Sequence, residues 1–572
     1  MEWIKRPSEF SSFAEQEEKI FADFTGARTD SYKYKIKNIE KAVSVITEYL
    51  KAGKTVKIIG DYDADGVTST SELILILKDL KKSYGSRSRI GYYIPKRFTD
   101  GYGMSQDIVK NFLLCENTPG LLITVDNGIA AIDAVKTAKE AGWAVVILDH
   151  HLPFVNDNKE IEYPKADVII DPAAVPGSAN FETYCAAGLV YKLAQNIDSL
   201  SENTVNKVLS LAAIGTVCDA VDLINIIGGH RSYDNYLIVK NGLNSLVQNN
   251  GRTTGLYCLL RMINKDCLIS ETDIAFVLGP IINAASRLND NGAVNVVELL
   301  IKDDNKFNET DVIAQALIDN NEVRKKIEAE VKPVMHKKIL AANEQNDFPI
   351  VVIGKPEEYH LGLLGILAGN VLETYNTPAI VLTPVTTQDN KVVYKGSARS
   401  PKGINIKKML DKVSDDIITY GGHARAAGLT VGVDKIEDFK KHIKSLSAKP
   451  ATCSRKYYDY EITCKEAASY AKLLKEKAPF GKGHEAPVFK ITDFTVYTKI
   501  SHYKYNIMGK NRNCIKIYGK ELNAVNFSGE GLKKYIELNE PTGMALYGTL
   551  GENVYLGKTE VQMQFVDIDS SV

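Results

Sequence analysis

The chain has 572 residues, 44% hydrophobic and 25% charged, which excludes a disordered or fibrous protein and predicts roughly three or four folded domains. Its 70 Lys and Arg residues balance 71 Asp and Glu residues, so a nucleic-acid partner would require a local basic groove. The eight cysteines form no C-x-x-C pair, and we see neither a signal peptide nor an apolar run that could cross a membrane. We therefore expect a protein of the reducing cytoplasm.

The first part of the chain alternates short apolar runs with helical patterns. Strands are predicted at 55–60, 89–95, 120–128, 143–151 and 166–172, and helices at 67–82 and 131–142. Nearly continuous apolar strands that alternate with helices are typical of a parallel, doubly wound α/β sheet.

The remainder of the chain shows three further patterns. Residues 183–345 are mostly helical and end in a long helix that we expect to be interrupted at Pro333. A second, smaller α/β region covers 348–448. After a helix at 465–477, short strands rich in Tyr, Phe and Lys predict a small β-barrel.

The segment GDYDADGVTSTSE, from Gly60 to Glu72, matches the pattern of a calcium-binding EF-hand loop. An EF-hand loop follows a helix and usually occurs in pairs, whereas this segment follows a predicted strand and no second loop is visible. The calcium interpretation is therefore the less favoured one.

Acidic or imidazole residues follow three of the predicted strands. They are Asp61, Asp63 and Asp65 after the first, Asp126 after the third, and Asp149, His150 and His151 after the fourth. A single Asp in this position is more often a helix cap, but the carboxyl ends of parallel strands share one edge, so we expect these clusters to converge. Asp219 could join them from the helical region. Carboxylates and imidazoles together suit manganese, with magnesium a weaker fit.

The motifs D-Y-D-A-D-G, V-D-N-G and D-H-H, followed by Asp219, resemble those of the DHH phosphoesterase superfamily, and within it of the RecJ single-strand-specific exonucleases. The resemblance covers nearly the whole chain. Six further stretches agree with it, namely IPKRFTDGYG, NAASRLN, HLGLLGILA, KGSARS, GGHARAAGLT and PFGKGHEAPVF. The family commonly has Arg and Gly where this chain has Ile281 and Ser286.

The resemblance implies an exonuclease that degrades single-stranded DNA from the 5′ end to mononucleotides with two Mn²⁺ or Mg²⁺ ions, in recombination or repair. It implies that Asp63, Asp65, Asp126, His150 and Asp219 hold the ions, with Asp61 a ligand or just behind. Asp126 is expected to bridge the two ions. His151 is expected to contact the scissile phosphate or assist proton transfer, with Asp149 orienting the histidines.

The resemblance also implies residues that bind the substrate. Gly421 and Gly422 would let backbone N–H groups approach a phosphate, although G-G-H alone reads as a turn. The other expected contacts are Ser397, Arg399, His423, Arg97 and Arg287 for phosphate and Tyr102 for stacking on a base. For Arg287 a structural salt bridge is equally expected, and Tyr102 alone would read as a core or loop residue.

The stretch Val496–Lys520 interleaves aromatic residues with Lys and Arg, which suits single-strand binding, the alternative being a solvated strand face. We expect a DHH catalytic domain with a helical extension at 1–306, a connecting helix at 307–346, a second α/β domain at 347–450 and an oligonucleotide-binding (OB) barrel at 451–572. The expected protein is a monomer whose protein partners would be a single-strand-binding protein or a helicase.

Three other functions compete with this one. The first is a phosphoesterase of the same superfamily acting on nanoRNA or on 3′-phosphoadenosine 5′-phosphate, which would resemble only the first two domains. The second is an inert single-strand-binding protein, which would not require the acids and histidines. The third is the calcium sensor.

Overall fold

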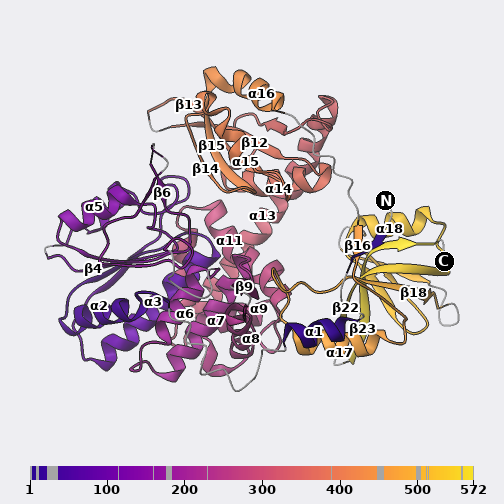
Figure 1. Cartoon of the computed structure of the whole chain (residues 1–572), viewed down its shortest axis with the longest axis horizontal. Coiled ribbons are helices and arrows are strands. Elements are labelled where there is room, and N and C mark those ends of the chain that lie inside the picture. The colour runs from indigo at the N-terminus through magenta and orange to yellow at the C-terminus, as the bar shows by residue number, and fades with distance from the viewer. Residues whose placement is uncertain are drawn as a thin grey trace. The chain divides into compact units, whose positions relative to one another are not determined.

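The computed structural model describes residues 3–7, 12–21, 36–113, 115–116, 118–156, 158, 160–175, 183–227, 230–387, 389–446, 456–497, 504–509, 512, 514–555 and 558–570. The chain forms two compact units (Figure 1). Unit 1 comprises Met1–Lys35, Ala220–Lys240 and Cys453–Val572, and unit 2 comprises Ile36–Asp219 and Asn241–Thr452.

Unit 2 begins with a five-stranded parallel sheet of order β3-β2-β4-β5-β8, which confirms the predicted parallel architecture. Its strands are β2 (Val56–Ile59), β3 (Ile90–Tyr93), β4 (Leu121–Val125), β5 (Ala144–Leu148) and β8 (Val168–Ile170). Apolar residues of α4 (Gln106–Leu113) and α5 (Ile132–Glu140) pack against β4 and β5. The helices α2 (Ile39–Lys51), α3 (Ala64–Ser83) and α6 (Ala186–Ala194) also contact the sheet.

Helices continue unit 2 after the sheet. They are α7 (Glu202–Cys218), α9 (Thr254–Met262), α10 (Glu271–Asp273), a π-helix (Ile274–Leu278), α11 (Gly279–Leu288), α12 (Gly292–Leu300) and α13 (Phe307–Ala341), while α8 (Asp234–Leu246) begins in unit 1. The expected interruption of α13 at Pro333 was wrong, because the helix runs through it. The proline removes one hydrogen bond, but the carbonyl that loses its donor belongs to the exposed Ala329.

The second α/β domain of unit 2 has a mixed sheet of order β11-β12-β13-β15-β14, in which only β11 and β12 are parallel. Its strands are β11 (Ile350–Ile353), β12 (Ala379–Thr386), β13 (Val392–Arg399), β14 (Thr419–Gly422) and β15 (Ala426–Gly432). Its helices are α14 (Leu364–Tyr375), α15 (Ile406–Asp411) and α16 (Ile436–Ser445).

Unit 1 contains a seven-stranded sheet of order β17-β18-β22-β23-β21-β20-β19, as the β-rich pattern predicts. The strands are β17 (Tyr460–Ile462), β18 (Phe489–Thr495), β19 (Tyr505–Met508), β20 (Cys514–Ile517), β21 (Asn523–Asn526), β22 (Gly543–Tyr555) and β23 (Lys558–Asp569). The helices α17 (Ala467–Lys477) and α18 (Gly529–Glu537) pack on this sheet.

The N-terminal segment folds with unit 1, whereas the sequence analysis assigns it to the catalytic domain. Strand β1 (Trp3–Lys5) pairs in parallel with β16 (Lys456–Tyr458), and the Trp3 ring stacks on Tyr547 at 4.4 Å between centroids. Phe13 of α1 (Phe13–Ile20) is buried in the unit 1 core. These apolar contacts, made by segments too short to show a periodic pattern, decide the assignment.

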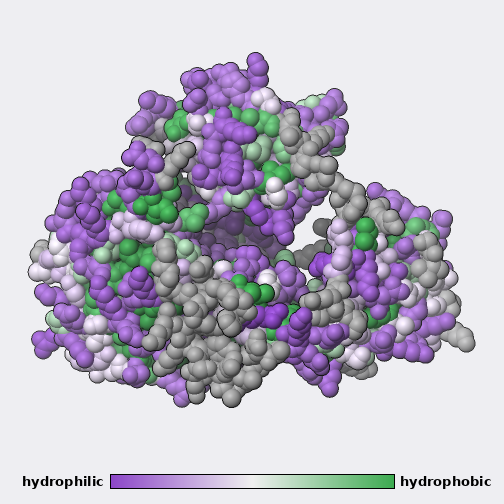
Figure 2. Space-filling model, viewed as in Figure 1, coloured by the Kyte–Doolittle hydropathy of each residue, from purple (hydrophilic) through white to green (hydrophobic). Residues whose placement is uncertain are grey.

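The remaining elements are short. They are β6 (Phe154–Val155), β7 (Ile161–Glu162), β9 (Asn225–Ile227), β10 (His230–Ser232) and single helical turns at Asn249–Gly251, Leu361–Leu363, Ser414–Asp416 and Val433–Lys435. Within the described ranges no helix is long and apolar enough to cross a membrane. The face seen in Figure 2 is mainly hydrophilic.

Candidate active site

The first acidic cluster lies where β2 passes into α3. Asp63 is the N-cap of α3, and its carboxylate accepts hydrogen bonds from the backbone N–H groups of Asp65 (3.0 Å) and Gly66 (3.1 Å). A Cβ at Gly66 would lie 2.5 Å from the carbonyl oxygen of Asp61, so this tight turn requires glycine. Asp63 is therefore a helix cap. In the same tight turn lie two further carboxylates, those of Asp61 and Asp65.

The carboxylate of Asp65 is held by the start of another helix. Its two oxygens accept hydrogen bonds from the first N–H groups of α6, those of Ala186 (2.7 Å) and Ala187 (2.9 Å). The positive end of the helix dipole thus supports a buried negative charge. Asn283 of α11 fixes the same turn from the other side, because its Oδ1 accepts a hydrogen bond of 3.0 Å from the N–H of Ala64.

The second cluster follows β4. Asp126 has a left-handed backbone conformation with φ of 60°, and its carbonyl oxygen accepts a 3.0 Å hydrogen bond from the Tyr102 hydroxyl. The side-chain amide of Asn127 donates to the carbonyl oxygens of Gly60 (3.0 Å) and Val125 (2.8 Å), which ties the ends of β2 and β4 together. The two strand ends are therefore held in register by one side chain.

The third cluster, after β5, is organised by Asp149. Its Oδ1 lies 2.8 Å from Nδ1 of His151 and accepts a 2.8 Å hydrogen bond from the His150 N–H, while its Oδ2 accepts one from the Ile129 N–H at 3.0 Å. Asp149 is buried and its oxygens face these donors. Asp149 thus contacts the ring of His151 but only the backbone of His150, and its predicted role in orienting the histidines stays a prediction.

The three clusters and Asp219 meet at the carboxyl edge of the sheet. His150 Nε2 lies 3.0 Å from Oδ1 of Asp126 and 3.6 Å from Oδ2 of Asp65, and its Nδ1 lies 3.7 Å from Oδ2 of Asp219. Three groups offer ligand atoms within 4.8 Å of one another: Asp126, His150 and His151; Asp65, His150 and Asp219; and Asp61, Asp63 and Asp126. Asp126 and His150 each belong to two of these groups.

The electrostatics of this edge fit a cation. Burial raises the pKa of Asp61 and Asp126, and neighbouring carboxylates raise both further. Burial lowers the pKa of His150, which keeps its imidazole neutral and able to bind a metal. Oδ1 of Asp61 is buried and has no hydrogen-bond partner within the described ranges. This edge therefore offers crowded carboxylates, a neutral imidazole and an unsatisfied oxygen. Such a donor set suits manganese or magnesium.

The pKa values of Asp149 and His151 shift in the opposite directions to those of Asp61 and His150. Burial opposes ionisation of Asp149, but the hydrogen bond and charge of His151, the charge of His150 and the hydrogen bond from the Ile129 N–H together outweigh it and lower the pKa of Asp149. Burial likewise lowers the pKa of His151, but Asp149 outweighs this effect and raises it to about 9. His151 therefore carries a proton at neutral pH when no metal is bound.

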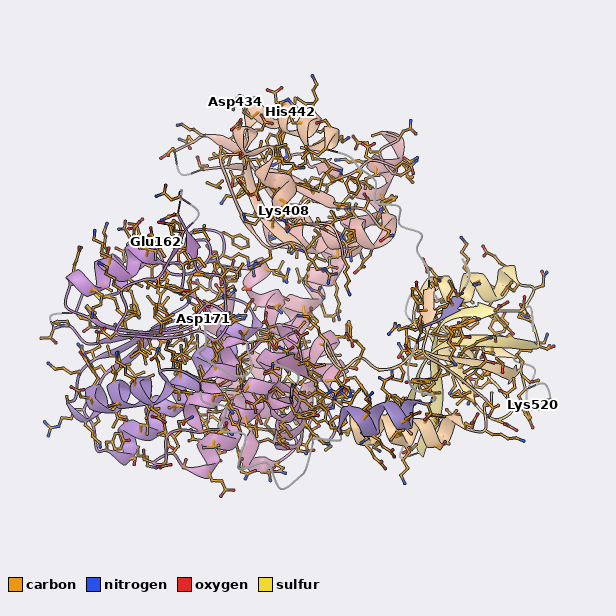
Figure 3. The ribbon with its side chains drawn as sticks, viewed as in Figure 1. Glu162, Asp171, Lys408, Asp434, His442 and Lys520 are labelled. Atoms are coloured by element: carbon orange, nitrogen blue, oxygen red, sulfur yellow. The ribbon has the colours of Figure 1, made fainter. Side chains whose placement is uncertain are left out.

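Asp171, labelled in Figure 3, accepts hydrogen bonds from the Ala173 and Ala174 N–H groups, as expected of a turn residue.

Arginines gather beside the acids. Burial lowers the pKa of Arg287 to about 10, and the positive charges of Arg97, Arg324 and Arg399 lower it too. Arg399 donates hydrogen bonds of 2.9 Å to Ser397 Oγ and to the Ala398 carbonyl oxygen. A Cβ at Gly365 would lie 2.6 Å from this guanidinium, which explains a glycine in H-L-G-L-L-G. Like charges crowd in this way where an anion is to be bound.

The G-G-H segment ends β14 and lies exposed. Gly422 has φ of 136°, and a Cβ there would lie 2.4 Å from the Ala426 carbonyl oxygen, whereas one at Gly421 would meet nothing within 4 Å. Although His423 is exposed to solvent by surface area, partial desolvation of its imidazole lowers its pKa, and the charge of His151 adds to this effect. His423 is therefore within electrostatic reach of the acidic edge.

Several predicted residues have neighbours that the sequence does not reveal. The hydroxyl of Tyr102 lies 3.0 Å from Nε2 of His151, and the side chain is half-exposed, so its proposed stacking on a base stays a prediction.

Ile281 and Ser286, the departures from the family pattern, are both buried in α11. Of the stretch Val496–Lys520, residues 498–503, 510–511 and 513 lie outside the described residues.

Sequence reasoning missed Asn283, Asn127 and Tyr62. The first occurs in N-A-A-S-R-L-N and the second in V-D-N-G, both within motifs that were noted, but no spacing rule connects an asparagine to a distant backbone N–H. Tyr62, between two of the acids, contacts Arg97 and Tyr102.

Comparisons with known proteins agree with this site. Family models match at residues 55–216 (DHH family, N-terminal domain), 347–449 (DHHA1 domain) and 458–567 (RecJ OB domain). The single-stranded-DNA-specific exonuclease RecJ of Dickeya dadantii is 30% identical over 474 residues, which cover 79% of this chain and 77% of that protein. Its namesake from Haemophilus influenzae is 28% identical over 503 residues, covering 84% and 80%.

Solved structures share the fold of this chain. The crystal structure of RecJ in complex with Mn²⁺ from Thermus thermophilus has a TM-score of 0.72 at 24% identity and covers 94% of this chain and 72% of that chain. The crystal structure of exonuclease RecJ bound to manganese has a TM-score of 0.57 at 26% identity and covers 73% and 95%. Because the identity with the Dickeya protein extends over most of both chains, and a RecJ-specific domain model matches the C-terminal part, this chain belongs to the RecJ family.

Proposed function

We propose that the protein is a metal-dependent exonuclease that hydrolyses single-stranded DNA from the 5′ end to mononucleotides, in DNA recombination or repair. The observation that carries this proposal is the meeting of three acidic and histidine clusters, with Asp126 and His150 each shared by two candidate ligand groups. Shared ligands of this kind suit two neighbouring ions rather than one. The relatives named as single-stranded-DNA-specific exonucleases support the substrate.

In the proposed mechanism the ions are held by Asp61, Asp63, Asp65, Asp126, His150 and Asp219. When bound, Mn²⁺ or Mg²⁺ would lower the pKa of water and polarise the phosphate oxygens. Asp149 holds Nδ1 of His151 at 2.8 Å, and the Tyr102 hydroxyl lies near both ring nitrogens, 3.2 Å from Nδ1 and 3.0 Å from Nε2. His151 can then donate a proton to a phosphate oxygen or to the leaving oxygen.

The arginines and the second domain would hold the strand. Arg97, Arg287 and Arg399 supply charge for phosphates, and Arg399 is braced by the Ser397 hydroxyl. Gly421, Gly422 and His423 would add contacts from β14, where the backbone is exposed. These assignments are supported by the shared electrostatic environment of the arginines and by the effect of His151 on the pKa of His423.

Unit 1 would also bind the single strand. It has a groove of about 720 Å³, lined by Asn506, Met508, Lys516, Val525, Phe527, Asn553, Thr559, Glu560 and Gln562. The Phe527 side chain is 56% exposed and can stack on a base. We expect Phe527→Ala to weaken the affinity for long single strands more than it slows the cleavage of a short oligonucleotide. Equal affinity for long strands would count against this groove.

One assay distinguishes the candidate functions. The protein is incubated with Mn²⁺ and, separately, single-stranded DNA labelled at the 5′ or 3′ end, duplex DNA, short RNA and the adenosine bisphosphate. We expect a labelled mononucleotide at once from the 5′-labelled strand and progressively shorter products from the 3′-labelled one. Preferred release of phosphate from the bisphosphate, or binding of DNA without cleavage, would refute the proposal.

The competing functions have less support. The match to a RecJ OB domain at 458–567 disfavours a phosphoesterase of small substrates. The EF-hand interpretation lacks its preceding helix, because strand β2 leads into the loop. We further propose a cytoplasmic monomer with a single-strand-binding protein or a helicase as partner, and sedimentation is expected to give the mass of one chain.

A further inference from the structure

Tyr62 stands between the metal-binding candidates Asp61 and Asp63, and the mechanism above gives it no role. Its aromatic ring contacts an arginine and another tyrosine. The guanidinium carbon of Arg97 lies 4.0 Å from the ring centroid, and the ring of Tyr102 meets it edge-on at 6.3 Å and 81°. The first contact has the geometry of a cation–π interaction.

The guanidinium of Arg97 contacts this ring and is also attracted by the charge of Asp61. Its Nε is buried and has no hydrogen-bond partner among the residues that the structure describes. A carboxylate in place of the ring would also hold the guanidinium, but it would occupy the N–H donors and cancel the charge. An aromatic face holds the cation while leaving its donors available to an anion.

Tyr102 extends the same line of contacts to the catalytic edge. Its hydroxyl donates to the Asp126 carbonyl oxygen at 3.0 Å and lies 3.0 Å from Nε2 of His151. The rings of Tyr62 and Tyr102 thus link Arg97 to His151 through successive contacts. Burial raises the pKa of Tyr62 to about 12, so its hydroxyl stays neutral in this charged surrounding.

We propose that Tyr62 is a positioning residue: its ring holds the guanidinium of Arg97 with the N–H groups directed at a phosphate of the bound strand. This inference rests on the proposed function, since it assigns a role within the same site. It predicts that the aromatic face of Tyr62, rather than its hydroxyl, matters. It also predicts that the effect of Tyr62 on the substrate passes through Arg97.

The test compares Tyr62→Phe, Tyr62→Leu and pentafluorophenylalanine at position 62, which keeps the shape of the ring but reverses its quadrupole. We expect Tyr62→Phe to stay within about twofold of the parent, and the other two to raise KM about fivefold to tenfold with kcat within about twofold. The dissociation constant for a single-stranded oligonucleotide in EDTA, where no cleavage occurs, should rise by the same factor. The isosteric ring keeps the test decisive if Tyr62→Leu does not fold.

A double-mutant cycle identifies the partner. In an Arg97→Ala background, Tyr62→Leu should change KM by less than about twofold, because the interaction is already absent. Equal effects of Tyr62→Leu with and without Arg97, or a loss of Mn²⁺ affinity with KM unchanged, would overturn the inference. Equal effects of Tyr62→Phe and Tyr62→Leu would overturn it as well.

A matched control is Tyr84→Leu. Tyr84 is the C-cap of α3, the helix that begins just after Tyr62. It also lies under a cation, Lys51 at 4.9 Å, and its hydroxyl contacts Ser199, which is outside the site. We expect its KM to equal that of the parent. Activity of the parent on single-stranded DNA tests the proposed function separately, because an inactive parent refutes that function whereas the EDTA binding series still tests Tyr62.

Discussion

Replacing Asp126 with Asn should make the metal-free protein more stable while abolishing its activity. Burial raises the pKa of Asp126, and repulsion by the carboxylates of Asp65, Asp63 and Asp61 raises it further. Asparagine tolerates the left-handed backbone of this position, and its Oδ1 can keep the contact with His150. The substitution therefore removes a charge and little else.

The size of the gain follows from the spacing of the ligand atoms. Two unit charges 4.8 Å apart repel by about 3 kcal/mol at an effective dielectric constant of about 20. The raised pKa values mean that the carboxylates share protons, which relieves part of this repulsion, so we expect a net gain of about 1–2 kcal/mol. Each kcal/mol raises the melting temperature of a domain of roughly 150–250 residues by about 2–4 °C, and that of the larger unit 2 by less.

The assay is calorimetry of the unit 2 transition in EDTA and in Mn²⁺, with nuclease activity measured in parallel. The parent should gain about 2.7 kcal/mol at a Mn²⁺ concentration a hundred times its dissociation constant, and the variant should lose most of this gain. Activity should fall by more than about a hundredfold, since Asp126 belongs to two ligand groups.

A variant that is less stable than the parent in EDTA, or that keeps the full rise with Mn²⁺, would refute the reasoning. The control is Asp167→Asn on the same sheet. Asp167 pairs with Lys139 at 2.6 Å, so its loss should lower the stability by less than about 1 kcal/mol and leave the response to Mn²⁺ intact.

Three further predictions follow from backbone and hydrogen-bond geometry. Gly422→Ala should lower the stability by about 1–3 kcal/mol because of its positive φ and the close carbonyl, whereas Gly421→Ala should be neutral in thermal unfolding. Asn283→Ala should lower kcat at least about tenfold with an unchanged circular dichroism spectrum, since it frees the turn at Ala64. Asp567→Asn should destabilise unit 1 by about 2–4 kcal/mol, because it removes the charge that pairs with two lysines and replaces one of the two accepting oxygens with an NH₂ donor.

The last prediction has a pH dependence of defined sign. Burial opposes the ionisation of Asp567, but Lys534, Lys456 and Trp3 outweigh it and lower its pKa to about 2. Its contribution is therefore complete above the ordinary carboxyl pKa of about 3.9 and is lost as the pH falls toward 2. In Asp567→Asn this part of the acid transition should be missing. An unchanged acid transition, a stable Gly422→Ala or a fully active Asn283→Ala would contradict the respective argument.

The sequence predicts the acidic edge well for a simple reason. Strand ends in a parallel sheet share an edge, so Asp61, Asp126 and Asp149 could be brought together without knowing any side-chain conformation. The structure adds what no pattern contains. The contact of Asn283 with a distant N–H and the capping of Asp65 by α6 depend on how helices pack, and several packings are compatible with one periodicity.

Two other differences have local causes. The three residues of β1 are too few to show alternation, so their pairing with β16 is invisible in the sequence. Pro333 is a helix breaker by propensity, but a long helix that is anchored on both sides tolerates a single missing hydrogen bond on an exposed face.

The pairing of β1 with β16 affects the order in which the two units can finish folding during synthesis. Strand β1 leaves the ribosome before either α/β domain, yet its partner follows both of them in the chain. The early segment must therefore stay available while unit 2 folds, and unit 1 is completed only near the end of translation. A nascent chain stalled before β16 would expose the Trp3 ring and the apolar face of α1. We therefore expect a chaperone to bind this N-terminal segment.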